Sequence, residues 1–157
     1  MGNRRKAREA SLQLLYEIDL GTRDCREVIG EFQKTPGRIL NQWAEPLSNA
    51  EEVLEFTVQI TMGVWENVHE IDRLIEMHST HWKISRMALV DRNILRMAVV
   101  DRNILRMAVF ELLWQPEVPA KAAINEAIEI AKKFGTEESG SFVNGVLDHI
   151  AKELKKV

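Results

Sequence analysis

Residues 4–20 read RRKAREASLQLLYEIDL and establish the helical pattern that most of the chain repeats. Apolar residues recur in this stretch every three or four positions, which predicts a helix with one buried face. The residues of that face are Ala7, Ala10, Leu14 and Ile18. Almost every later segment has the same period, and no convincing run alternates as a strand would. The sequence therefore predicts an all-α fold.

The same stretch carries charge and an aromatic ring beside its apolar face. Four of the five residues from Arg4 to Arg8 are cationic. Tyr16 follows Arg5 by eleven residues, so the two lie about 20° apart around the helix and roughly 16 Å apart along it. Cations that hold phosphates and a ring that stacks on a base would bind a single-stranded nucleic acid. A solvated basic first turn with Tyr16 half in the core explains the same residues, because a short basic run is a weak motif.

Composition limits the class of protein. The chain has 157 residues, 45% of them hydrophobic, and a formal net charge of −3, which fits one soluble globular domain. Because the net charge is negative, any nucleic-acid site must be a local basic patch. Cys25 is the only cysteine, so a reducing compartment is expected. No apolar run approaches the roughly 20 residues that span a bilayer, so we expect a cytoplasmic protein that does not contact membranes.

Glycine and proline mark the ends of about seven expected helices. Gly21 ends the first helix, a short helix follows over residues 26–34, and residues 35–48 form a connecting loop. Near the C-terminus one helix covers residues 120–134. Thr136 is expected to cap the last helix and to place two glutamates in its first turn.

Between the loop and the repeat described below, one apolar stripe continues for about 30 residues, from Asn49 past Ile75. A helix of that length spans roughly 45 Å and must join two packing centres. We therefore expect two small helical bundles that share a long central helix. The N-terminal subdomain would cover about residues 1–80 and the C-terminal subdomain about residues 81–157.

A tandem repeat follows this segment. MALVDRNILR at residues 87–96 precedes MAVVDRNILR at 97–106, and nine of the ten positions match. Ten residues advance a helix by 1000°, 80° short of three turns, so the two copies cannot face the same core. Because the apolar residues of the second copy continue into the next segment, we expect that copy to keep the core register. The first copy would form a poorly buried helical extension or a reworked connection.

No motif predicts enzymatic chemistry, and we expect no catalytic residue, metal or cofactor. The Asp-Arg pairs at 91–92 and 101–102 are interpreted as surface ion-pairing groups, since adjacent helical residues point about 100° apart. His78 and His81 lack the cysteines or HExxH context of a zinc site, which favours a role at a helix end. The acidic pairs on the last two helices have no nucleophile or metal ligands beside them.

The stretch KKFGTEESGSFVNGVLDHI, residues 132–150, offers a second candidate site. It places the start of a helix beside Ser139, Phe142 and Asn144. Backbone N–H groups at such a start suit a phosphate, and Phe142 lies at the margin of the apolar stripe, where it could meet a base. A capped helix start with Phe142 as a packing contact explains the same pattern equally well.

Three blocks of the chain resemble the NusB family of bacterial transcription antitermination factors. They are RRKAREASLQLLYEIDL, DRNILRMAVFELL and VPAKAAINEAIEIAKKFGTEESGSFVNGVLDHIA, in that order. The resemblance implies two helical bundles and no enzymatic activity. It further implies binding of the boxA segment of ribosomal RNA leader transcripts together with a small-subunit ribosomal protein (NusE), within the RNA polymerase antitermination complex.

Carried over by position, the resemblance implies RNA contacts at eleven residues. These are Arg4, Arg5, Lys6, Arg8, Tyr16, Asp101, Arg102, Arg106, Glu138, Phe142 and Asn144. If the first copy of the repeat held the family register, the roles at 101, 102 and 106 would move to Asp91, Arg92 and Arg96. The chain departs from the family in the repeat itself and at Ser141, where relatives often carry a lysine.

Two other functions fit the same fold. The first is an RNA-recruiting module of a ribosomal RNA methyltransferase, which would require a separate catalytic chain. The second is a helical protein–protein adaptor or homodimer in which the basic start is incidental.

Overall fold

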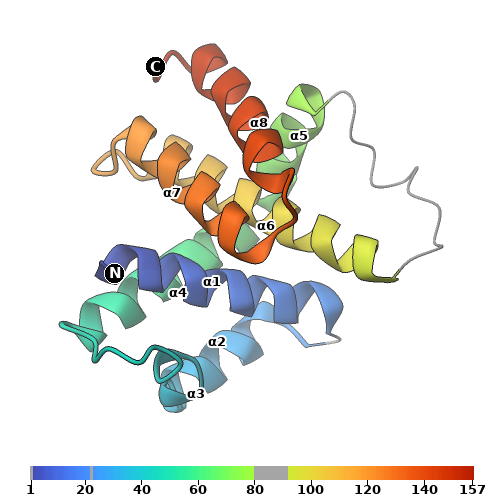
Figure 1. Ribbon diagram of the computed structural model, residues 1–157. Coiled ribbons are helices and arrows are strands. Elements are labelled where there is room, and N and C mark those ends of the chain that lie inside the picture. The colour runs from blue at the N-terminus through green and yellow to red at the C-terminus, as the bar shows by residue number, and fades with distance from the viewer. Residues whose placement is uncertain (1, 22, 80–91) are drawn as a thin grey trace. The chain divides into compact units, whose positions relative to one another are not determined.

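The computed structural model describes residues 2–21, 23–79 and 92–157, and for residues 92–98 it describes the backbone alone. The described residues form eight helices and no strand, which confirms the all-α prediction (Figure 1). They divide into two compact units, Met1–Glu66 and Asn67–Val157. The helices are α1 (Asn3–Leu20), α2 (Cys25–Lys34), α3 (Gly37–Leu40), α4 (Ala50–Glu66), α5 (Val68–His78), α6 (Arg92–Trp114), α7 (Ala120–Phe134) and α8 (Ser139–Glu153).

The first unit is built on α1 and α4, which lie side by side and run in the same direction (Figure 1). Near the start of both helices, Asn3 Nδ2 donates to Glu52 Oε2 at 2.8 Å. Further along, Ser11 Oγ donates to the carbonyl oxygen of Thr57 at 3.2 Å. The predicted apolar face of α1 is buried, and α2 packs against both helices. The unit therefore holds the basic start of α1 on a packed helix pair.

Two details of this region differ from the sequence prediction. The predicted loop contains the short helix α3, because Ile39 and Leu40 are buried and fix one turn of backbone. The expected continuous helix from Asn49 is interrupted at Asn67, which has φ −115° and ψ 16°. Asparagine is a weak helix former that suits a cap position, and the apolar stripe on either side does not reveal this break. The boundary of the two units falls at this interruption.

The second unit is organised around α6, which packs against α5, α7 and α8 (Figure 1). Ile104, Leu105 and Val109 of α6 are fully buried. The second copy of the repeat thus holds the core register, as predicted. Residues 92–96, the second half of the first copy, form the N-terminal end of α6, while residues 87–91 lie outside the described residues.

The residues after the repeat explain why the second copy holds this register. If the first copy occupied the core position, every residue of α6 would be replaced by the one ten places before it. Arg102 would then stand where Leu112 is buried with 4% of its surface exposed. Burying a guanidinium without a partner costs far more than burying leucine. The sequence MAVFELLW at 107–114 therefore fixes the register of the copy before it.

Candidate nucleic-acid interface

The basic start of α1 is ordered by an aromatic ring of α4. The guanidinium carbon of Arg4 lies 4.8 Å from the centroid of the Phe56 ring, and that of Arg8 lies 5.5 Å from it. Both distances are within the range of cation–π attraction. Phe56 itself is only 6% exposed, so it forms a fixed platform. Sequence reasoning assigned Phe56 to the apolar stripe of its helix and had no signal for this second role.

The four cations of this start differ in exposure. Arg4 is exposed and Arg5 is partly exposed, whereas Lys6 and Arg8 are 3% and 5% exposed. Of the predicted cationic contacts, Arg4 and Arg5 therefore have the most surface open to a ligand.

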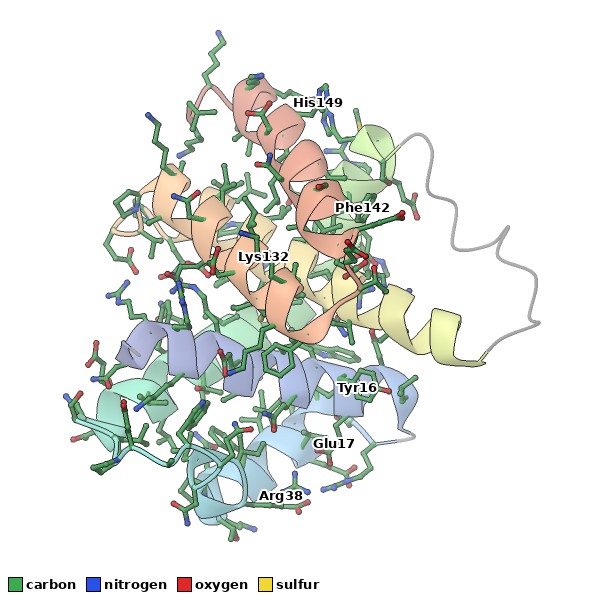
Figure 2. All side chains as sticks on the ribbon, viewed as in Figure 1. Tyr16, Glu17, Arg38, Lys132, Phe142 and His149 are labelled. Carbon is green, nitrogen blue, oxygen red and sulfur yellow. The ribbon has the colours of Figure 1, made fainter. Side chains whose placement is uncertain are left out.

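Tyr16 lies in the second half of α1 and is half-buried (Figure 2). Beside it, Glu17 accepts hydrogen bonds from Arg38 at 2.9 Å and from Arg23 at 3.4 Å. Helix α1 thus carries exposed cations at its first turn and an accessible ring three turns later, with a compensated carboxylate next to the ring. Within the first unit, this is the arrangement of cations and a ring that the sequence analysis associated with binding a single-stranded nucleic acid.

The second candidate site, the start of α8, is a tight turn closed by Ser139. The hydroxyl Oγ of Ser139 accepts from the backbone N–H of Thr136 at 2.8 Å. A Cβ on Gly135 would collide with this oxygen, so the turn requires glycine there. Thr136 does not cap the helix as predicted. The helix begins at Ser139, and Glu137 and Glu138 precede it.

The predicted contacts of α8 are accessible to different degrees. Glu138 and Asn144 are exposed, and Phe142 is half-buried in the first turns of the helix (Figure 2). The backbone N–H of Phe142 donates to the carbonyl of Glu138 at 3.0 Å, which ties the two together. The start of α8 therefore presents an aromatic ring and polar groups at one end of the second unit.

Asp101 is not a surface ion-pairing group, and this part of the prediction is wrong. Its side chain is 6% exposed, and its Oδ2 accepts from the hydroxyl of Ser139 at 3.0 Å. Burial raises the pKa of Asp101 above its ordinary value of 3.8, while the hydrogen bond from Ser139 acts in the opposite direction. Helix α6 therefore turns this carboxylate inward, toward the start of α8.

Arg106 also points inward. Its Nε and Nη2 donate to the two carboxylate oxygens of Asp72 on α5, both at 2.7 Å, and its Nη1 donates to Asn103 Oδ1 at 3.1 Å. Arg102, which lies between Asp101 and Arg106 in the sequence, is half-buried. The polar residues of the second repeat copy thus connect α6 to α8 at one point and to α5 at another.

The alternative positions in the first copy cannot be compared in the same way. Asp91 lies outside the described residues, as does His81, and the side chains of Arg92 and Arg96 are not described. His78 is the last residue of α5, where its Nε2 lies 2.6 Å from Glu153 Oε2 and its ring stacks on that of His149, with 6.4 Å between the ring centroids. No group of three potential metal ligands occurs in the described part of the chain. None of the described helices is both long enough and apolar enough to cross a membrane.

Comparison with known proteins identifies the class. A sequence model of the NusB family matches residues 5–101 and 96–152. The transcription antitermination protein NusB of Myxococcus xanthus (strain DK1622) is 37% identical over 159 aligned positions, which cover 99% of each chain. The structure of T. maritima NusB is 36% identical and aligns with a TM-score of 0.73, covering 96% of this chain and 91% of that one. The class is thus a helical, non-enzymatic transcription antitermination protein.

The chain belongs to the NusB family. A second similar structure is that of the antitermination factors NusB and NusE in complex with dsRNA, at 25% identity and a TM-score of 0.71, covering 96% of this chain and 97% of that one. The two segments that match the family model overlap inside the tandem repeat. Such an overlap is expected when a chain holds an extra copy of one unit.

Proposed function

We propose that this protein binds boxA RNA of ribosomal RNA leader transcripts together with a small-subunit ribosomal protein, NusE, in the cytoplasmic antitermination complex of RNA polymerase. The observation that carries the proposal is the exposed basic start of α1, with Arg4 held on Phe56 and Arg5 beside it, on a chain whose net charge is −3. A local patch of this kind attracts phosphates without making the whole protein bind nucleic acid. The solved NusB–NusE–RNA complex of a relative supports the same partners.

In this proposal α1 and the start of α8 each make their own contacts with RNA. Arg4 and Arg5 hold phosphates, and Tyr16 stacks on an unpaired base, while the start of α8 contributes Phe142, Glu138 and Asn144. Lys6, Arg8, Asp101 and Arg106 are buried, so their contribution is to hold the exposed residues in place. Arg102 is half-buried and remains a candidate contact.

The basic patch is tested by fluorescence anisotropy with dye-labelled boxA RNA at several salt concentrations. The double variant Arg4→Ala, Arg5→Ala should bind more weakly, and the slope of log K against log salt should fall by about 0.7 for each phosphate that the variant no longer neutralises. The matched control is Arg23→Ala, Arg38→Ala, which removes the same charge from the same unit. Equal weakening by both double variants would show that overall charge, and not this patch, determines binding.

Tyr16 provides an independent test of the aromatic contact. Stacking of one base on a ring contributes about 1–3 kcal/mol, so Tyr16→Ala should weaken binding by roughly five- to a hundredfold. Tyr16→Phe keeps the ring and should bind nearly as wild type. If Tyr16→Phe is as weak as Tyr16→Ala, the hydroxyl and not stacking makes the contact.

Sedimentation velocity distinguishes the proposed complex with the ribosomal protein from the adaptor alternative. The protein, the ribosomal protein and boxA RNA should form one complex that sediments faster than any pair. A stable homodimer that ignores both RNA and the ribosomal protein would favour the adaptor function instead.

A further inference from the structure

We infer that the hydrogen bond from Ser139 to Asp101 is the positioning contact of the proposed RNA site, and that Asp101 acts on RNA only through the start of α8. This inference rests on the proposed function. It assigns Asp101 a role different from the direct RNA contact that its position in the family pattern implied.

The first support is geometric. Asp101 is 6% exposed and Ser139 is 1% exposed, so neither side chain has the surface to contact RNA. Their hydrogen bond, 3.0 Å from Oγ to Oδ2, joins α6 to the first residue of α8. Glu138 is adjacent to that residue, and Phe142 follows it by less than one turn. A displacement of Ser139 would therefore move both candidate contacts.

The second support is that the serine hydroxyl fixes two segments at once. It donates its hydrogen to Asp101 and accepts the N–H of Thr136 at 2.8 Å. This bond closes the turn between α7 and α8, which Gly135 makes possible. The same oxygen of Ser139 lies 3.1 Å from the hydroxyl of Thr136. Removal of the carboxylate would leave the Ser139 hydroxyl with its contacts to Thr136 alone, so the carboxylate is what joins this turn to α6.

The third support is that burying the carboxylate of Asp101 is unfavourable in free energy. Oδ1 of Asp101 is buried and has no hydrogen-bond partner among the described residues. A carboxylate held by one hydrogen bond in an apolar environment stabilises a fold less than a leucine would. Its presence is explained by what it holds, because an apolar side chain cannot accept the hydrogen bond of Ser139.

The test compares boxA RNA affinity of the full-length variants Asp101→Ala, Asp101→Asn, Ser139→Ala and Asp101→Ala with Ser139→Ala. Each alanine variant should bind roughly tenfold more weakly, and the double variant should bind no more weakly than either, because both remove the same contact. Asn keeps a carbonyl oxygen that can accept from Ser139, so Asp101→Asn should retain most of the affinity. The control is Asp148→Ala on α8, which removes a surface carboxylate paired with Lys152 at 2.7 Å and should leave affinity unchanged.

Wild-type affinity in Asp101→Ala would overturn the inference. It would also be overturned if Asp101→Asn bound as weakly as Asp101→Ala, because the negative charge itself would then be required. Additive effects in the double variant would likewise contradict a shared contact.

Amide hydrogen exchange of residues 136–142 separates this inference from the proposed function. Ser139→Ala and Asp101→Ala should both accelerate exchange there, and Asp101→Asn much less. If the alanine variants accelerate exchange as expected but the wild-type protein does not bind boxA RNA, only the proposed function is refuted. If RNA binding is confirmed but exchange in these residues is unchanged, the positioning role is wrong.

Discussion

The two units of this protein use the same chemical groups in opposite ways. In the second unit, Arg106 forms a two-pronged pair with Asp72, and the arginine side chain is 9% exposed. In the first unit, Arg23 and Arg38 form a network with Glu17 and Glu31, and all four side chains are 33% to 47% exposed. The contact of Arg38 with Glu17, at 2.9 Å, is nearly as short as that of Arg106 with Asp72, at 2.7 Å, so distance alone does not tell which of them matters.

Solvent accounts for the difference. An exposed arginine without its partner regains water, whereas a buried one or its partner is left without compensation. Arg23 still lowers the pKa of Glu31, through a hydrogen bond and through its charge, although the pair is at the surface. The comparison predicts large effects for substitutions of the inward-facing residues of α6 and small ones for the surface network.

The largest effect is expected for Arg106→Ala. It leaves the Asp72 carboxylate and the Asn103 side chain without their shared donor, which should lower the free energy of unfolding by about 2–3 kcal/mol in urea titrations. The decrease should lie below that of a fully buried pair because Asp72 is 33% exposed.

The repeat provides a matched control for this change. Arg96→Ala is the same substitution within an identical local sequence, NILRMAV, ten residues earlier. Because Arg106 holds Asp72, Arg96→Ala should change stability far less. Equal destabilisation in the two variants would show that the copies share the role, contrary to the register of α6.

A smaller effect is expected from Asp101→Asn, and it should depend on pH. Burial raises the pKa of Asp101 in the folded protein above its ordinary value of 3.8. The folded state therefore binds this proton more tightly than the unfolded chain, and this group's contribution to stability decreases as pH rises from about 4 through the folded-state pKa. Asp101→Asn cannot lose a proton, so its stability relative to wild type should increase over that range.

Urea midpoints measured between pH 4 and pH 7 give this comparison directly. A relative stability of Asp101→Asn that falls with rising pH would mean that the folded protein favours the charged carboxylate.

Helical periodicity predicted the all-α class and the register of the second repeat copy, but not every helix boundary and not the polar core. The stripe of α1 and the continuation of the second repeat copy into Ala108 and Leu112 are local patterns, and both were predicted correctly. Asp101 was misassigned to the surface because its partner, Ser139, is 38 residues away, and the pairing of Arg106 with Asp72 spans 34 residues. A charged residue is buried only when a distant partner meets it, and one sequence does not contain that information.

The residues of the candidate site also differ in whether the sequence could predict them. The exposed residues Arg4, Glu138 and Asn144 were predictable because charge, helix position and polarity are local properties. The ring of Phe56 beneath Arg4 was not predictable, since the two are far apart in sequence and Phe56 also fits an apolar stripe. The break at Asn67 was missed because an apolar stripe can continue across a short interruption of the helix.

The smallest effect is expected for Arg38→Ala, which removes the contacts to Glu17 at 2.9 Å and to Glu31 at 3.8 Å. Both carboxylates remain in water, and Arg23 still contacts each of them, so the urea midpoint should hardly change. Raising the salt concentration should reduce even this difference, because exposed charges are screened. A destabilisation as large as that of Arg106→Ala would mean that the surface network holds α3 against α1, and that exposure is the wrong measure of what an ion pair contributes in this protein.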